Sequence, residues 1–304
     1  MLYNIKDRLN RAYYTLACGQ IRKTDPLVLD STSNLAVLSQ IQHKDVLMYL
    51  LALKSFASRL MPGAVYVLND GSLTDADVDL LKRHVPSMTF LDIGGFRSSV
   101  CPSGGCWERL LAIAELISHH YIIQLDADTL ATGPLDEVRR HVEQETSFVI
   151  GTWDKQEFEP MEERCGEAKK QNPHQDSHVQ IVSEANFDKL GNYANLKYVR
   201  GCAGFSGFAR GSFSKGFVEG FSQDMERVIG RKWHTWGSEQ VMSNIVVANS
   251  PKSEVLPHPK YCSCQKLAPE TVFIHFVGNC RFNNGTYARL GRREIRHLLA
   301  KSRA

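Results

Sequence analysis

Short apolar segments alternate regularly with amphipathic ones over the first half of this chain, and this alternation restricts its fold more than any other feature. The segment 107–120 is typical of the helical ones, because Leu110, Ile113, Ala114 and Ile117 fall at positions i, i+3, i+4 and i+7. The strand candidates are residues 35–38, 64–68, 88–91, 121–125 and 147–150. Strands that alternate with helices in this way predict β-α-β units. We therefore expect an α/β fold, with a Rossmann-like, mostly parallel sheet flanked by helices.

The second half of the chain is less regular. Residues 154–176 are dense in charge and are predicted to form a mobile, solvated excursion. A helix is expected over 236–247 and a strand over 271–276. No repeat or low-complexity linker divides the chain, which favours one composite domain. The expected parts are a helical extension over 1–33, the composite domain over 34–285 and a basic helix or tail over 286–304.

Composition excludes several classes of protein. The chain has 304 residues, 36 Lys and Arg against 33 Asp and Glu, and a net charge of +3, which argues against a nucleic-acid partner. Its longest apolar run, residues 46–53, is far shorter than the roughly 20 residues that cross a bilayer. The N-terminus carries charges and no apolar signal region, so we expect a cytoplasmic protein. The eight cysteines include no CxxC pair and are expected to be reduced thiols.

Positive charge is concentrated at the C-terminal end. Residues 281–304 contain one acidic residue, Glu294, and seven basic ones. The basic residues are Arg281, Arg289, Arg292, Arg293, Arg296, Lys301 and Arg303. Together with Leu290, Ile295 and Leu299 they indicate a short amphipathic helix. Such a helix favours a peripheral contact with the anionic inner face of a membrane, the alternative being a solvated terminal helix.

The triplet Asp126-Ala127-Asp128 is the strongest chemical signal in the sequence. It directly follows an apolar strand candidate, and side chains at positions i and i+2 of an extended segment point the same way. Two neighbouring carboxylates repel each other unless a cation or a proton lies between them. Oxygen ligands of this kind suit Mg²⁺ or Mn²⁺. The alternative is a solvated turn at the end of a strand.

Two chemistries share this motif. In a haloacid-dehalogenase-like phosphatase, Asp126 would be a covalent nucleophile and Asp128 its acid/base. That site needs further carboxylates downstream to complete its Mg²⁺ site, and the aspartates after Leu130 fall in no such pattern. The phosphatase therefore ranks second.

The other chemistry is glycosyl transfer. Residues 34–285 resemble GT-A-fold, nucleotide-sugar-dependent glycosyltransferases and are most similar to family 8 and its relatives. The resemblance implies that Asp126 and Asp128 bind Mn²⁺ or Mg²⁺, which holds the donor diphosphate. The segment Ile274–Gly278 resembles the His-Phe-x-Gly motif of the family, which makes His275 the third metal ligand. The motif ends at Gly278, and Arg281 stands where the family has Lys-Pro-Trp, as a candidate diphosphate contact.

Further motifs of the family fall in the expected order. Arg109, one helix before the Asp-Ala-Asp triplet, corresponds to a basic residue that contacts the donor. The segment that begins at Gly204 resembles the strand that lines the sugar pocket. Glu239 and Gln240 resemble the Asp-Gln pair of the family, whose acid contacts the sugar hydroxyls and whose Gln lies under the anomeric carbon.

The ends of the first two predicted strands are expected to face the uracil and ribose of a UDP donor. They carry Ser39 and Gln40 on the first strand, and Asn69 and Asp70 on the second. Asp70 precedes Gly71 and equally fits an ordinary turn.

The resemblance implies a metal-dependent glycosyltransferase. It would move a sugar, with retention of configuration, from a UDP-sugar to a carbohydrate, glycolipid or protein acceptor that the sequence does not identify. A module that binds a sugar nucleotide without catalysis is a further alternative. A sugar-nucleotide pyrophosphorylase is disfavoured, because the chain lacks the Gly-rich basic loop that such an enzyme needs near its N-terminus.

Overall fold

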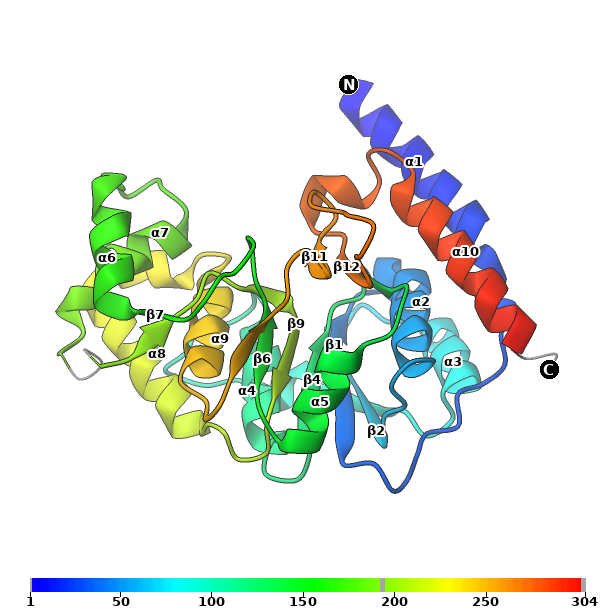
Figure 1. The fold of residues 1–304 in the computed structure, drawn as a ribbon, viewed down its shortest axis with the longest axis horizontal. Coiled ribbons are helices and arrows are strands. Elements are labelled where there is room, and N and C mark those ends of the chain that lie inside the picture. Colours follow the sequence, from blue (N-terminus) through cyan, green and yellow to red (C-terminus); the bar gives the residue numbers. More distant parts are fainter. Residues whose placement is uncertain (1, 192–194, 302–304) are drawn as a thin grey trace. The chain divides into compact units, whose positions relative to one another are not determined.

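The structure is a computed structural model that describes residues 2–191 and 195–301, with side chains from residue 8 onward except at position 279. Arg303 of the predicted basic tail lies outside the described residues. Figure 1 shows the chain from its N-terminal helix to its C-terminal helix. In the described part of the chain, no helix combines the length and the apolar character needed to cross a membrane.

Seven strands form one sheet in the order β10-β6-β9-β4-β1-β2-β3. Their bounds are β1 Leu35–Ile41, β2 Ala64–Asn69, β3 Thr89–Asp92, β4 Tyr121–Leu125, β6 Phe148–Ile150, β9 Cys202–Phe208 and β10 Glu254–Leu256. β1 pairs with β2, and β10 with β6, in parallel, whereas β6 pairs with β9 in antiparallel fashion. Every residue of β1 and β4 is buried except Gln40, as expected of strands covered on both faces. The predicted α/β architecture is confirmed.

Two smaller sheets complete the strands. One has the order β11-β12-β5 and the other pairs β7 with β8. Their bounds are β5 Thr129–Ala131, β7 Glu159–Pro160, β8 Lys197–Tyr198, β11 Tyr261–Ser263 and β12 Phe273–His275. The strand predicted over 271–276 is therefore present but shorter, and β5 and β11 were not predicted.

The helices follow most of the predicted amphipathic segments. Their bounds are α1 Leu2–Cys18, α2 Val46–Ala57, α3 Asp75–His84, α4 Trp107–Leu116, α5 Asp136–Gln144, α6 Met161–Lys170, α7 Val179–Glu184, α8 Lys215–Ile229, α9 Ser238–Ala248 and α10 Thr286–Lys301. α3 begins at a capping box in which the Thr74 hydroxyl accepts a hydrogen bond from the Asp77 amide and the Asp77 carboxylate accepts one from the Thr74 amide.

The prediction of a solvated excursion over 154–176 is wrong, because α6 lies inside it. Most charged residues of α6 are exposed, and Arg164 is the buried exception. Met161, Cys165 and Ala168 form a buried face at positions i, i+4 and i+7. Because charged residues are so frequent in 154–176, the apolar spacing of this amphipathic helix was not recognised in the sequence.

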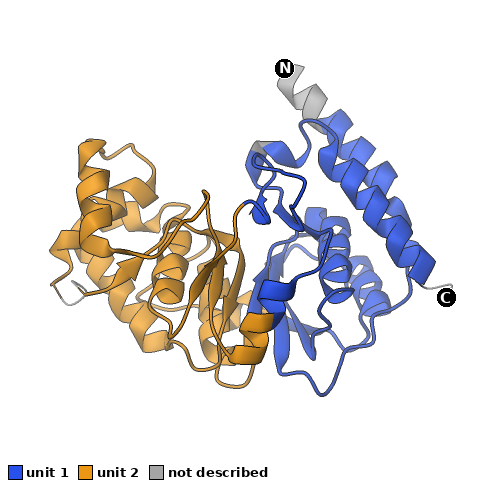
Figure 2. Cartoon of the chain, in the orientation of Figure 1, with its two compact units in different colours: residues 1–91, 123–139, 259–304 blue, residues 92–122, 140–258 orange. Residues whose placement is uncertain are grey.

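The chain divides into two compact units, coloured separately in Figure 2. Unit 1 contains residues 1–91, 123–139 and 259–304, and unit 2 contains residues 92–122 and 140–258. Both units are built from segments distant in sequence. α1 and α10, from the predicted extension and tail, both belong to unit 1, and the boundaries at 33/34 and 285/286 remain predictions.

Candidate metal centre

Three predicted metal ligands of unit 1 meet at one point. The Nε2 atom of His275 lies 3.2 Å from Oδ1 of Asp128 and 3.7 Å from Oδ2 of Asp126. One ligand atom from each of the three residues lies within 4.8 Å of the other two. Asp128 and His275 are buried, and Asp126 is half-buried. The sequence prediction that these residues share a site is therefore supported by their geometry.

Strand pairing explains why His275 reaches the Asp-Ala-Asp triplet. β4 ends at Leu125, the triplet follows, and β5 begins at Thr129. β5 pairs with β12 in antiparallel fashion, and the register places His275 opposite Thr129. In addition, the amide of Phe276 donates to the carbonyl of Asp128 over 2.8 Å. The segments that carry the predicted metal ligands are thus held together by backbone hydrogen bonds.

The donor set fits a divalent cation. Two carboxylates and one imidazole offer the oxygen and nitrogen ligands that Mn²⁺ and Mg²⁺ accept, with positions left for oxygens of a bound phosphate. Burial alone would raise the pKa of Asp128, but the charges of His275 and Arg281 and their hydrogen bonds hold it well below its usual value. Asp128 is therefore ionised at neutral pH, as a metal ligand must be.

Arg281 also reaches this cluster. Its Nη2 forms an ion pair with Oδ2 of Asp128, on the carboxylate that His275 contacts through Oδ1. Asp45, just before α2, interacts electrostatically with both Arg281 and Asp128. Burial raises the pKa of Asp45, and the charge of Arg281 partly offsets that effect. Arg281 thus lies beside Asp128, and its contact with a diphosphate stays a prediction, whereas no motif indicated Asp45.

A layer of aromatic and hydroxyl side chains lies behind the triplet. The ring of Tyr287, on α10, stacks on Phe276 at 4.1 Å between centroids, and its hydroxyl donates to the carbonyl of Ala127 over 3.4 Å. The Thr129 hydroxyl donates to the carbonyl of Asp126 over 2.8 Å. The Ser39 hydroxyl, which is fully buried, donates to the carbonyl of Leu125 over 2.6 Å. Ser39 was predicted to face a nucleotide, but its hydroxyl is committed to the backbone that carries Asp126.

The other residues predicted to contact the nucleotide lie at the ends of β1 and β2. The parallel register pairs Gln40 with Leu68 and Ile41 with Asn69, so Gln40 and Asn69 share one edge of the sheet. Oε1 of Gln40 is buried and has no hydrogen-bond partner among the described residues. Asp70 accepts hydrogen bonds from the amide and hydroxyl of Ser72, which fits the turn alternative.

Two of the four predicted donor residues of unit 2, Arg109 and Glu239, lie in contact. Nη2 of Arg109, at the start of α4, lies 3.4 Å from Oε1 of Glu239, at the start of α9, and both side chains are 5 % exposed. Gln240 follows Glu239 and is half-buried, and Gly204 lies in the buried strand β9. Arg109 and Glu239 thus satisfy each other's charge, a role that the sequence did not predict.

The segment that follows His275 is constrained by a glycine and by a disulfide. Gly278 has a φ of +59°, a conformation that favours glycine, and a Cβ there would meet no atom within 4 Å. Cys264 and Cys280 form a disulfide, with their Cα atoms 6.2 Å apart. The expectation that the cysteines are reduced is wrong for this pair. A disulfide requires its two Cα atoms to lie close together, and the sequence does not show that Cys264 and Cys280 meet this condition. The cytoplasmic location remains a prediction.

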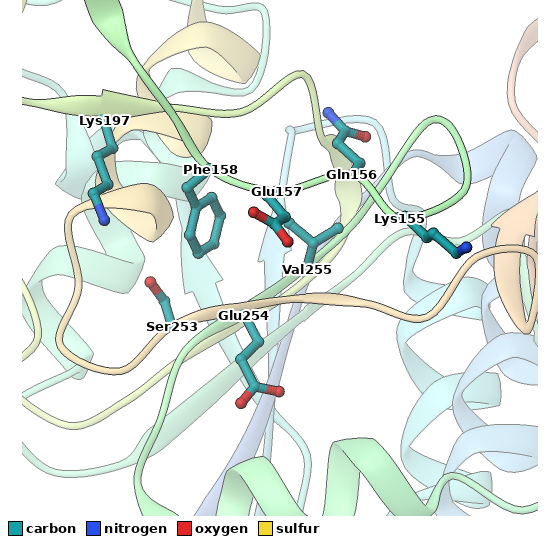
Figure 3. A pocket seen from close by; sticks show the side chains of 8 residues that line it. All are labelled: Lys155, Gln156, Glu157, Phe158, Lys197, Ser253, Glu254 and Val255. Atoms are coloured by element: carbon teal, nitrogen blue, oxygen red, sulfur yellow. The ribbon is translucent and has the colours of Figure 1, made fainter.

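A separate cavity of about 520 Å³ lies in unit 2. Figure 3 shows its lining, which carries charges of both signs and one aromatic ring. The lining residues are Lys155, Gln156, Glu157, Phe158, Lys197, Ser253, Glu254 and Val255. None of the predicted site residues lines it, so it gives no support to their assignment.

The comparisons with known proteins assign no family to this chain. No protein-family model matches the chain. No curated protein matches it either. Among solved structures, the bifunctional glycosyltransferase WbbM is 14% identical, with 92% of this chain and 53% of that one covered and a TM-score of 0.49. This chain thus spans about half the length of WbbM.

Two further solved structures are similarly distant. Mouse xyloside xylosyltransferase 1 is 11% identical, with 82% of this chain and 98% of that one covered and a TM-score of 0.47. Core-mannan synthase A from Aspergillus fumigatus, solved in a Mn/GDP form, is 10% identical, with 92% and 87% covered and a TM-score of 0.42. With identities of 10–14% and TM-scores below 0.5, these similarities do not assign an activity to this chain.

Proposed function

We propose that this chain is a metal-dependent glycosyltransferase of the GT-A type, related to family 8, that uses a nucleotide-sugar donor. One observation carries the proposal: Asp126, Asp128 and His275 come from two distant segments, and their ligand atoms lie within 4.8 Å of one another. The order of the sequence motifs points to the same three residues as metal ligands, independently of these distances. Mn²⁺ and Mg²⁺ both suit the donor set.

The divalent cation, when bound, would neutralise the donor diphosphate and stabilise the nucleotide as it leaves. Asp126 and Asp128 provide the carboxylates and His275 the imidazole. Arg281 supplies a guanidinium beside the same carboxylate, from where it would contact a phosphate oxygen. Ser39, Thr129 and Tyr287 bond the backbone carbonyls of residues 125–127 and so fix the direction of the two carboxylates.

The finer assignments rest on the resemblance to the family. In this proposal the donor is a UDP-sugar, whose uridine lies near Gln40 and Asn69. Glu239 and Gln240, with Arg109 and Gly204, would contact the donor sugar, and the anomeric configuration would be retained. The acceptor is a carbohydrate, a glycolipid or a protein.

The phosphatase alternative predicts a different cluster. It requires a third carboxylate at the metal, whereas the third residue of this cluster is a histidine. A histidine in that position therefore favours the glycosyltransferase, whose cation holds a diphosphate. It disfavours the phosphatase, which forms a covalent aspartyl-phosphate. A module that only binds the nucleotide sugar would keep the same metal ligands, and it is distinguished by the absence of turnover.

Thermal unfolding with UDP-, GDP- and CMP-sugars, each with and without Mn²⁺, tests the proposal, because a ligand that binds the folded state raises the melting temperature. We expect a rise with UDP-sugars that requires Mn²⁺. Asp126→Ala should abolish this rise and all metal-dependent UDP-sugar turnover, whereas the exposed Asp154→Ala should behave as the wild type. Normal turnover in Asp126→Ala would refute the assignment, and a rise with GDP-sugars alone would refute the UDP donor.

A further inference from the structure

Helix α1 exposes an apolar face. Leu9, Tyr13 and Leu16, at positions i, i+4 and i+7, are 65 %, 52 % and 83 % exposed. The opposite face of α1 is buried, with Tyr14 at 3 % and Cys18 at 0 % exposure. A soluble surface helix normally shows its polar face to water, and α1 exposes these three apolar side chains in addition to polar ones such as Arg8 and Thr15.

α1 packs against α10, side by side in Figure 1. The ring of Tyr14 lies 4.6 Å from that of Tyr287, and the Sγ atom of Cys18 contacts the carbonyl of Ala288 at 3.9 Å. The two helices run in the same direction, because later residues of α1 contact later residues of α10. Both belong to unit 1, so the apolar face of α1 and the outer face of α10 are parts of one packed pair.

The outer face of α10 is cationic. Arg289, Arg292 and Arg296 lie at positions i, i+3 and i+7 and are exposed. None of these three forms an ion pair with a carboxylate among the described residues. The acidic residue of α10, Glu294, is buried and receives a 2.8 Å hydrogen bond from Arg59. The positive charge of this face is therefore not neutralised within the described part of the chain.

Part of the apolar face of α10 is buried against the core of unit 1. Ile295 is 1 % exposed, and Gly291 approaches the core so closely that a Cβ there would lie 2.8 Å from Leu51. The peripheral membrane contact expected of α10 from its sequence stays a prediction, but Ile295 cannot take part in it, and Leu290 and Leu299 are half-buried. The exposed apolar side chains are on α1, while α10 contributes charge.

We propose that the α1–α10 pair binds the surface of an anionic lipid bilayer. Leu9, Tyr13 and Leu16 enter the boundary between headgroups and acyl chains, and the α10 arginines contact the lipid phosphates. Charge complementarity selects this partner over a second copy of the chain, because two copies docked through this face would bring like charges together. This inference is independent of the proposed transfer reaction.

Vesicle co-sedimentation of the full chain tests the proposal. Vesicles of phosphatidylcholine alone are compared with vesicles that also contain phosphatidylserine, at low and raised salt. The wild type should bind only the anionic vesicles and should be released by salt. Leu16→Ser should weaken binding about tenfold through lost apolar burial. The triple variant Arg289→Gln/Arg292→Gln/Arg296→Gln should weaken it about a hundredfold, at about 1 kcal/mol for each charge.

Matched variants of unit 1 serve as controls. Val28 is as exposed as Leu16, at 83 %, so Val28→Ser should leave binding within about twofold of wild type. The triple variant Lys82→Gln/Arg83→Gln/Lys266→Gln removes the same charge from exposed positions elsewhere in unit 1 and should bind within about tenfold of wild type. Thermal unfolding checks that each variant is folded, and Tyr13→Ser provides a second variant of the apolar face.

Several outcomes would overturn the proposal. The first is a wild type that does not bind anionic vesicles. The second is equal vesicle binding by Leu16→Ser and Val28→Ser. The third is an equal loss of vesicle binding in the two triple variants. Light scattering measures the oligomeric state and so tests whether a second copy of the chain covers this face instead of lipid. If Leu16→Ser converts a dimer to a monomer without a change in vesicle binding, a second copy of the chain covers this face and the lipid proposal fails.

Discussion

The Nε2 atom of His275 lies 3.2 Å from Oδ1 of Asp128, although residues 140–258 of unit 2 separate the two in sequence. The contact follows from the pairing of β5 with β12, which sets His275 opposite Thr129. A histidine and two aspartates are thus assembled by a short sheet within unit 1. Donor binding would rest on this arrangement.

Arg281 and a bound cation would compete for Asp128, because the guanidinium already pairs with Oδ2 of that carboxylate. We expect Arg281→Gln to bind Mn²⁺ about fivefold more tightly in the absence of nucleotide, as one ion pair is removed. The same variant should show a higher KM for the donor, since it lacks a phosphate contact. Titration calorimetry and donor kinetics measure the two effects, with the exposed Arg97→Gln as control. Weaker Mn²⁺ binding by Arg281→Gln would show that the arginine does not compete.

The sequence predicted the elements that have a clear periodicity. β1, β2, β4 and α4 were all predicted, because apolar runs and helical spacing identify elements of that length. β5 and β11 have three residues each, too few to show any period. α6 was missed because its buried side chains are spaced among many charges.

The candidate site was predicted in part. The motif order assigned Asp126, Asp128 and His275, whose proximity depends on the register of β5 and β12. The electrostatic role of Asp45 and the stacking of Tyr287 on Phe276 have no sequence signal, because they arise where separate helices meet the triplet.

His84 should make unit 1 sensitive to acid. Burial, with the positive charges of Lys54 and Arg83, lowers the pKa of His84 from 6.5 to about 4. Between pH 6.5 and 4 the unfolded chain binds more protons at this residue than the folded one, so stability falls as the pH is lowered. The loss between pH 7.5 and pH 5 should be about 2 kcal/mol.

Urea unfolding of wild type and His84→Leu at these two pH values measures the effect. The variant should lack the part of the loss that His84 causes, whereas the exposed His119→Leu should retain it. An equal loss in wild type and His84→Leu would contradict the assignment.

Gly207 should tolerate no side chain. A Cβ there would lie 2.2 Å from Cε1 of Phe148 and 2.6 Å from the hydroxyl oxygen of Tyr121. We expect Gly207→Ala to lower the free energy of unfolding by about 2 kcal/mol. A Cβ at Gly216, in α8, would meet only the Ser214 hydroxyl, at 4.0 Å, and Gly216→Ala should be neutral or stabilising by up to about 1 kcal/mol. Similar stabilities of the two variants in chemical unfolding would contradict this packing.

The buried pair of Arg109 and Glu239 should be required for the stability of unit 2. Glu239→Ala leaves the Arg109 guanidinium buried without this partner and should cost about 3 kcal/mol. The double variant Arg109→Met/Glu239→Met should recover most of this loss, as measured by chemical unfolding. If both variants are as stable as wild type, the two residues do not stabilise the fold through this pair.

Calorimetric titration of Mn²⁺ into the nucleotide-free protein tests the central claim most directly. The account predicts that His275→Ala and Asp128→Asn each bind Mn²⁺ at least about a hundredfold more weakly than wild type, while the exposed His119→Ala binds it normally. If His275→Ala and Asp128→Asn bind Mn²⁺ as tightly as wild type, then Asp126, Asp128 and His275 are not a metal centre and the account is wrong.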